Sequence, residues 1–138
     1  MTGQGPRKSV GDDHWKGRLN QAREFRESAR NLVTLAASST YNPAITLMIA
    51  GAIAYADAIT ARRKGVVNTQ DHAAAPRLLR EILGNTLPDR QEKFYRRLLG
   101  RKDEVNYGAR STSLEEAKRL LSELDDFAEW AEDALSSY

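Results

Sequence analysis

Residues 42–65 read NPAITLMIAGAIAYADAITARRKG, and most of this segment is predicted to be one helix, from about residue 43 to 64. Asn42 suits the N-cap, Pro43 suits the first helical position and Gly65 suits the end. The predicted helix is apolar nearly all round, which is typical of a central helix that other helices cover. Either the rest of this chain or a second subunit must therefore surround it.

Four more helices are predicted on both sides of this segment, because apolar residues recur there at three- and four-residue steps and no stretch alternates with period two. They are expected at about residues 13–37, 72–83, 89–106 and 113–135. Gly100 allows the helix of 89–106 to bend, and Ser113 with Glu116 has the spacing of a capping box at the start of the last helix. The sequence therefore predicts an all-α fold, an up-and-down bundle of four long helices plus one short helix.

The length of 138 residues predicts a single domain, which we place at residues 13–138 after a flexible N-terminal tail at residues 1–12. A chain of this size can bury a core without a disulfide or a metal ion. The tail is polar and lacks the apolar core of a signal peptide. The longest apolar run, Ala44 to Ile59, contains Tyr55 and Asp57 and is expected to be too short to span a bilayer, so no membrane association is predicted.

The chain contains no cysteine, so disulfides and thiolate chemistry are excluded and a cytoplasmic location is the simplest expectation. Its two histidines, His14 and His72, are far apart in the sequence, and neither has metal-ligand spacing around it. No metal ion or other cofactor is therefore predicted.

Charge is unevenly distributed along the chain, although the net charge is only +2. Residues 77–102 hold eight basic and three acidic side chains, whereas residues 113–138 hold eight acidic and two basic ones. The asymmetry indicates either a basic face that attracts a polyanion or basic and acidic helices that pack side by side. The arginines on the outer face of the first predicted helix are expected to be solvated: Arg18, Arg23, Arg26 and Arg30.

The stretch Gly100 to Gly108, GRKDEVNYG, concentrates more polar chemistry than any other part of the chain. Arg101 is a candidate phosphate clamp, since a guanidinium presents a rigid fork of donors. The alternative is that Arg101 caps carbonyls or pairs with Asp103, Glu104 or the acidic last helix. Asn106 and Tyr107 could line a nucleotide cleft or form a helix C-cap ahead of the glycine.

Two polar residues outside this stretch are candidates for supporting the same site. Asp57 lies on an apolar helix, and a buried carboxylate needs a partner. That partner is either an arginine on a neighbouring helix or the polar site around Arg101. His72 lies near a helix start and is either a loop or capping residue or a further member of the site.

Several short motifs occur in a fixed order along the chain. They are Tyr55-Ala56-Asp57-Ala58, Asp71-His72-Ala73, Leu78-Leu79, the step from Arg101 to Tyr107-Gly108, Glu116-Ala117 and Phe127-Ala128-Glu129-Trp130. In this order they resemble the HEPN superfamily, helical-bundle domains found in toxins, RNA-processing factors and nucleotidyltransferase partners. The resemblance spans about residues 14 to 135.

The resemblance implies a bundle that usually dimerises, and active members of the family are metal-independent ribonucleases with an Arg, four to six residues and then a His. Arg101 matches the arginine, but the residue after four positions is Asn106 rather than His. An amide cannot shuttle a proton near neutral pH as an imidazole does. Tyr107 can donate a hydrogen bond to a phosphate, but its ordinary pKa of about 10 makes it a poor base.

Three functions remain open at this point. The first is a HEPN-like nucleotide- or RNA-binding module, a homodimer with weak or no catalysis, that uses Arg97, Arg101, Lys102, Asn106 and Tyr107. The second is a divergent metal-independent ribonuclease in which Arg101 and Tyr107 are catalytic. The third is a structural dimer that binds a partner protein, such as a nucleotidyltransferase.

Overall fold

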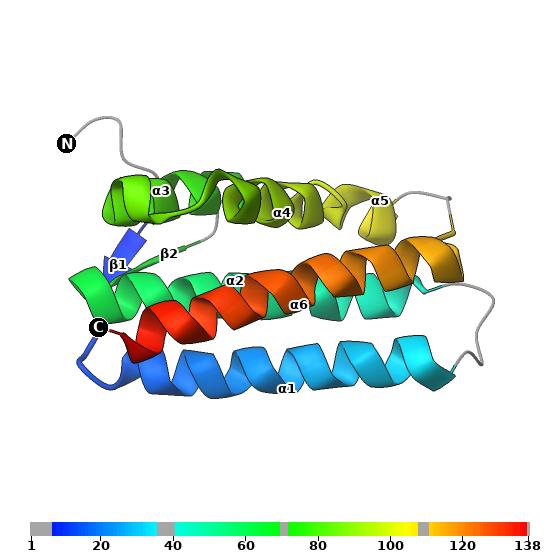
Figure 1. Cartoon of the computed structure of the whole chain (residues 1–138), viewed down its shortest axis with the longest axis horizontal. Coiled ribbons are helices and arrows are strands. Elements are labelled where there is room, and N and C mark those ends of the chain that lie inside the picture. The colour runs from blue at the N-terminus through cyan, green and yellow to red at the C-terminus, as the bar shows by residue number, and fades with distance from the viewer. Residues whose placement is uncertain (1–6, 36–40, 70–71, 108–110, 138) are drawn as a thin grey trace.

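The computed structural model describes residues 7–35, 41–69, 72–107 and 111–137, and the side chains of Asn106 and Tyr107 lie outside the described part. Its α-helices are α1 (His14–Leu35), α2 (Asn42–Lys64), α3 (Ala75–Leu83), α4 (Asp89–Leu99), α5 (Lys102–Tyr107) and α6 (Leu114–Ser136) (Figure 1). Two short 3-10 helices, η1 (His72–Ala74) and η2 (Gly84–Thr86), and two strands, β1 (Arg7–Ser9) and β2 (Val66–Asn68), complete the elements.

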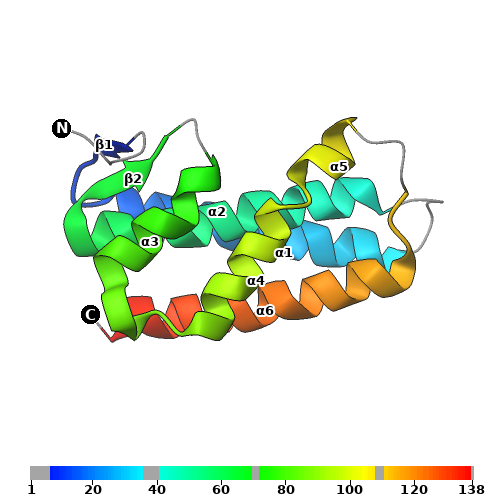
Figure 2. The ribbon, with the colours of Figure 1, turned by 90° about the horizontal axis from the view of Figure 1, so that it is seen from above.

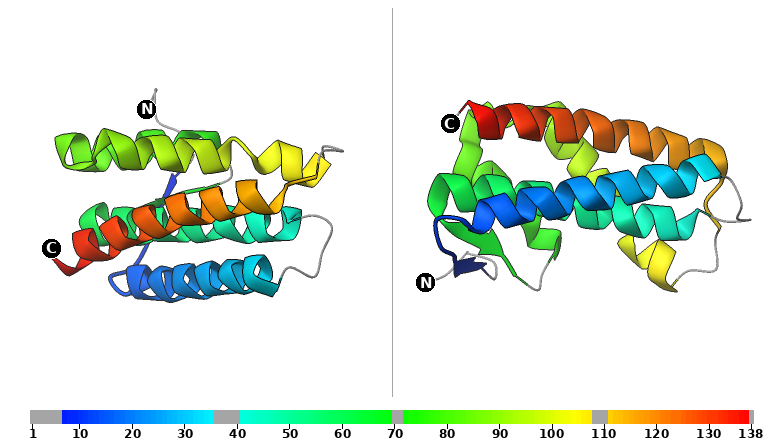
Figure 3. Two further views of the ribbon diagram at one scale, coloured as in Figure 1. Left: turned by 45° about the vertical axis from the view of Figure 1, so that its right-hand side comes forward. Right: turned by 90° about the horizontal axis from the view of Figure 1, so that it is seen from below.

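The predicted all-α bundle is confirmed. Three long helices, α1, α2 and α6, run side by side, and α3, α4 and α5 follow one another over the face of α2 and α6 that α1 does not cover (Figures 1 and 3). The helix expected over 89–106 is divided at Gly100 into α4 and α5. The layer opposite α1 is therefore built from three short helices, because the turn at η2 and the break at Gly100 interrupt it.

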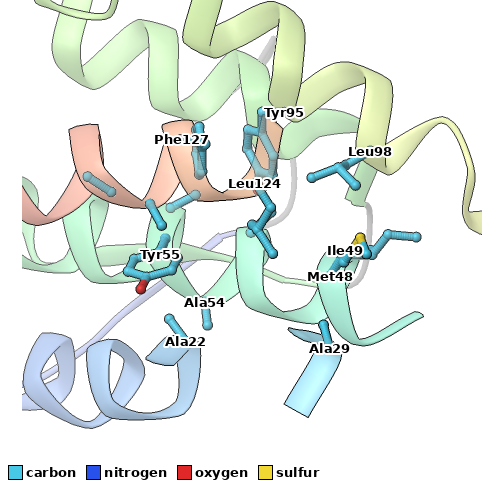
Figure 4. Packing of buried hydrophobic residues seen from close by; sticks show 14 of the residues in the cluster. Ala22, Ala29, Met48, Ile49, Ala54, Tyr55, Tyr95, Leu98, Leu124 and Phe127 are labelled. Atoms are coloured by element: carbon cyan, nitrogen blue, oxygen red, sulfur yellow. The ribbon is translucent and has the colours of Figure 1, made fainter. Parts of the chain in front are cut away.

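The core forms where α2 meets its neighbours. Tyr55, Tyr95 and Phe127 are fully buried, and the rings of Tyr95 and Phe127 stack with centroids 5.2 Å apart (Figure 4). Small residues of α2 let α1 approach closely, since a Cβ on Gly51 would lie 3.4 Å from the Cβ of Phe25. As predicted, α2 is a central helix, and the other helices of the same chain supply most of its cover.

The ends of the helices follow the sequence signals with one exception. Gly65 adopts the left-handed conformation at φ 65° and donates its N–H to Ala61 O, which ends α2 as predicted. The Ser113 hydroxyl accepts a hydrogen bond from the Glu116 N–H, which caps α6 as predicted. The prediction that Asn42 is the N-cap of α2 is wrong. Asn42 is the first helical residue, and its side chain is committed to the segment before α6 instead.

A small antiparallel sheet corrects the predicted flexible tail. Within residues 7–12, Arg7–Ser9 pairs with Val66–Asn68, directly after α2. The guanidinium of Arg7 also forms an ion pair with Glu81 at 2.9 Å. Three-residue strands show no periodicity, so the sequence carried no signal for them. Residues 1–6 of the predicted tail lie outside the described residues.

The arginines on α1 correct a second expectation, since they contact α2 and α6 rather than standing free in solvent. Arg18 pairs with Asp57. On the other side of the helix Arg23 pairs with Glu132, and Arg26 and Arg30 both pair with Asp125: the N–O distances are 2.5, 2.8 and 2.7 Å. These ion pairs orient α1 against the two helices that it covers.

By length and composition alone, α2 is long enough and apolar enough to cross a membrane, with a mean hydropathy of 1.6 over its most apolar window. The prediction that its apolar run is too short to span a bilayer is therefore wrong. Burial provides the distinction, because 72% of that window lies inside the bundle, as in the core helix of a soluble protein. The fold is compatible with a soluble protein.

The close approach of α1 to α2 at Gly51 gives the first testable prediction. Gly51→Leu should lower the free energy of unfolding by about 2 kcal/mol or more, because the larger side chain pushes the two helices apart. Gly51→Ala is the control and should stay within about 1 kcal/mol, since a lone Cβ fits and alanine favours the helix. Urea unfolding followed by circular dichroism measures both. Equal effects of the two substitutions would contradict the close packing.

Candidate functional site

Arg101 lies between α4 and α5, and two carboxylates hold its guanidinium. Its Nε is 2.9 Å from Glu104 and its NH1 is 2.6 Å from Glu116, in the first turn of α6. Its NH2 is 3.4 Å from the Thr112 hydroxyl. The side chain is only 12% exposed. Arg101 therefore fastens the joint between α4 and α5 to the start of α6, which is the pairing alternative considered from the sequence.

The contacts of Arg101 continue into the start of α2. The Thr112 hydroxyl donates a hydrogen bond to the Asn42 side-chain oxygen at 2.5 Å, and the Tyr41 N–H donates to the Thr112 carbonyl at 3.3 Å. Thr112 is almost completely buried. A series of hydrogen bonds and ion pairs thus links α5, the start of α6 and the start of α2 at one end of the bundle. Arg101, with two carboxylate partners, holds these helices in position.

Asn106 and Tyr107 belong to the last turn of α5, but their side chains lie outside the described residues. Their predicted contacts with a nucleotide, and the catalytic role given to Tyr107 in the ribonuclease alternative, therefore stay predictions.

Asp57 is paired elsewhere. Its Oδ2 lies 3.0 Å from Arg18 NH2 and 3.2 Å from Arg18 Nε, so its partner is an arginine on a neighbouring helix. Burial raises the pKa of Asp57 to about 6, and the attraction of Arg18 offsets only part of that cost. No described contact joins Asp57 to Arg101, so the structure does not bring these two predicted residues together.

His72 and Lys102 meet although thirty positions separate them in the sequence. Lys102 Nζ lies 3.4 Å from His72 Nδ1. An ammonium only donates, so this contact requires an Nδ1 that accepts. The structure therefore brings together two of the predicted site residues, one from η1 and one from the first residue of α5.

A cleft of about 430 Å³ lies at this contact, which we call the His72–Lys102 cleft. Figure 2, seen from above, shows α5 and the segment that leads into α3 set apart along α2. The side chains and backbone that line the cleft are those of His72, Ala73, Pro76, Arg96, Leu99, Gly100, Lys102 and Asp103. It combines the cations of Arg96 and Lys102, the imidazole of His72, the carboxylate of Asp103 and an apolar wall, so among the described residues basic groups outnumber the one acidic group. Such a cleft, apolar with a few convergent polar groups, is the usual setting of a small-ligand site.

Most of the basic charge between residues 77 and 102 is paired with acids of the same chain. Arg90 pairs with Asp126, Arg97 with Glu123, Arg101 with Glu116, Arg80 with Asp89 and Glu92, and Arg96 with Glu92. Three of these pairs join α4 and the joint after it to α6. For these three pairs the structure shows basic and acidic helices packed side by side. One of the three arginines is Arg97, a predicted RNA-binding residue, and its guanidinium pairs with Glu123.

The walls of the cleft were missed by the sequence analysis. Pro76 and Leu99 look like ordinary helix residues, and their shared cavity depends on how η1 and α3 lie against α4. Arg96 gave a signal only as one of several clustered bases. Among the described residues, no group of three or more His, Cys, Asp or Glu side chains could hold a metal ion.

No protein-family model and no curated protein matches this sequence. The residues and contacts of the chain itself therefore carry the functional argument.

The contacts of Arg101 generate a stability prediction. Arg101→Ala and Glu116→Ala should each lower the free energy of unfolding by about 2 kcal/mol, because each removes the 2.6 Å ion pair between two side chains that are only 12% and 16% exposed. The double variant should lose less than the sum, by about 1 kcal/mol or more. Arg119→Ala is the control: its guanidinium is 62% exposed and 3.9 Å from Glu116, so its effect should stay below about 0.5 kcal/mol. Additive losses in the urea-unfolding cycle would show that the two residues do not act as a pair.

The raised pKa of Asp57 generates a prediction about pH. Because the folded-state pKa of about 6 exceeds the ordinary 3.8, folding takes up a proton between these values, and ionisation of Asp57 costs stability as pH rises. The unfolding free energy of the wild type minus that of Asp57→Asn should fall by up to about 3 kcal/mol from pH 4 to above pH 6.

Urea unfolding at several pH values measures this difference, and the exposed Asp12→Asn serves as the control that should show no such trend. A difference that rises with pH would show that the ion pair with Arg18 outweighs burial.

Proposed function

We propose that this chain is a HEPN-like module that binds the phosphate groups of RNA or of a nucleotide in the His72–Lys102 cleft, without catalysis. The observation that carries the proposal is the convergence of Arg96, Lys102 and His72 on one cleft from two separate parts of the chain. Arginine, which can donate two parallel hydrogen bonds to one phosphate, and lysine, which presents a compact positive charge, are the side chains that bind phosphate best.

The donors of the cleft are accessible to a ligand. Arg96 is 52% exposed, and its ion pair is with Glu92, one turn earlier on the same helix. Glu92 is mostly buried but keeps Arg80 as a second partner, so a phosphate can compete for the exposed guanidinium of Arg96 without leaving the carboxylate unpaired. The Lys102 ammonium has three N–H donors, and among the described residues it contacts only His72.

The absence of catalysis follows from the chemistry of the residues that match the family motif. Arg101 is engaged by Glu104 and Glu116, and Asn106 stands where active members have a histidine. An amide supplies no general base near neutral pH. The proposal accordingly replaces Arg101 and Arg97 by Arg96 as the arginine that contacts phosphate. It keeps the predicted Lys102, Asn106 and Tyr107 as further contacts.

The homodimer implied by the resemblance is part of the proposal, as is a cytoplasmic location. Light scattering on the purified chain determines its mass in solution and so tests the dimer. The structural-dimer alternative, with a partner protein such as a nucleotidyltransferase, would gain support if the chain dimerised and bound no nucleic acid or nucleotide.

The binding prediction compares two double variants with the same change in charge. The double variant Arg96→Ala/Lys102→Ala should bind a labelled single-stranded RNA at least about tenfold more weakly than the wild type, because each substitution removes a charge-assisted hydrogen bond to phosphate. Lys64→Ala with Lys118→Ala, both exposed and outside the cleft, should have a much smaller effect. Wild-type binding should also weaken from about 50 to about 200 mM salt.

Fluorescence anisotropy in EDTA measures the affinities, and a gel of the same samples detects cleavage. Equal losses in the two double variants would mean that net charge alone attracts the RNA, which overturns the assignment of the cleft. RNA cleavage by the wild type would overturn the non-catalytic reading and support the ribonuclease alternative. No binding of the RNA by the wild type would overturn RNA as the ligand, and the absence of nucleotide binding as well would overturn the proposal as a whole.

A further inference from the structure

A second, apolar cavity adjoins the His72–Lys102 cleft. Its volume is about 180 Å³. It is lined by Thr46, Ile49, Ala50 and Ile53 of α2, by Val105 of α5, and by His72 and Lys102, which line both cavities. The apolar cavity and the cationic cleft are therefore contiguous, because His72 and Lys102 line both.

The α2 residues of this apolar cavity form one stripe of the helix, since their spacing of three, four and seven positions places them on one face. Ile49 is buried, but Ala50 and Ile53 are only half-buried and Thr46 is exposed. This stripe is therefore an apolar part of the central helix that the described residues leave incompletely covered. An apolar group placed there would gain burial.

The charge beside the stripe restricts what can cover it. Lys102 borders both cavities and Arg96 the cleft, whereas among the described residues Asp103 is the one acidic residue that lines the cleft and none lines the apolar cavity. A ligand that occupies both cavities must carry an apolar or flat part for the apolar cavity and, next to it, an anionic group for the cleft. A phosphate ester of a small organic group has this chemistry.

The apolar cavity offers little with which to distinguish one base from another. Its hydroxyl, on Thr46, donates to the Asn42 carbonyl at 3.2 Å within α2. The other α2 and α5 side chains that line it are aliphatic. Aliphatic contacts favour any flat apolar face, whereas discrimination between bases needs hydrogen bonds to their edges.

We propose that the two cavities form one bipartite site for a nucleoside monophosphate unit, with its phosphate at Arg96 and Lys102 and its base against Ile49, Ile53 and Val105. The site requires a base but does not select among bases. This inference rests on the proposed function, because it assigns the phosphate to the same cleft.

The test uses isothermal titration calorimetry on the full chain with AMP, UMP and ribose 5-phosphate. AMP and UMP should bind with similar affinity, and each should bind about tenfold tighter than ribose 5-phosphate, since burying a few tens of Å² of apolar surface is worth about that factor. Ala50→Leu fills the apolar cavity and should reduce AMP binding to the level of ribose 5-phosphate while leaving ribose 5-phosphate unchanged.

The matched control is Ala134→Leu, the same change at a half-buried position of α6 outside both cavities, which should leave all affinities unchanged. Ribose 5-phosphate binding as tightly as AMP would overturn the bipartite site but leave the proposed phosphate cleft intact. Hexyl phosphate binding more tightly than AMP would overturn the base as the occupant. No binding of any of these phosphates would overturn the bipartite site, and the proposed cleft would fall with it only if the labelled RNA also failed to bind.

Discussion

The whole structure depends on one constraint, the need of α2 for cover on nearly every side. Its small residues let α1 approach closely at Gly51, and α6 and the short helices cover the other sides. Burial of apolar surface is the dominant stabilising contribution to folding, so the other elements are arranged by what α2 requires. The stripe from Thr46 to Ile53, where that cover is incomplete, lines the apolar cavity that adjoins the His72–Lys102 cleft.

Charge in this protein acts mainly between helices. Acids of α6 pair with arginines of α1 on one side and with arginines of α4 on the other, so the acidic last helix holds two basic ones. Removing one partner of a partly buried ion pair is costly, so these pairs favour an arrangement of the helices in which each charge is matched. The excess of basic residues between 77 and 102 is therefore explained mainly by the acidic helix α6, which packs against α4. It indicates a polyanionic ligand less strongly.

The most polar stretch of the chain illustrates the same point. Arg101 had the strongest chemical signal in the sequence, yet its guanidinium contacts Glu104, Glu116 and Thr112 and joins three helices. The two cations that line the His72–Lys102 cleft are neighbours of Arg101 in sequence, since Lys102 follows it directly and Arg96 lies five residues before it. A polar residue next to a break between helices can thus be engaged by the contacts that stabilise the break, as Arg101 is, rather than face a ligand.

The sequence by itself determined the helical class, the central place of α2 and several helix ends, because these depend on local periodicity and on caps such as Gly65 and Ser113. It also indicated that Asp57 needs a partner. Only the tertiary structure decided which arginine that is, which carboxylates hold Arg101, that Arg7–Ser9 forms a strand, and that His72 meets Lys102. These pairings depend on how helices far apart in the chain rotate and pack against each other, and local sequence does not encode that rotation.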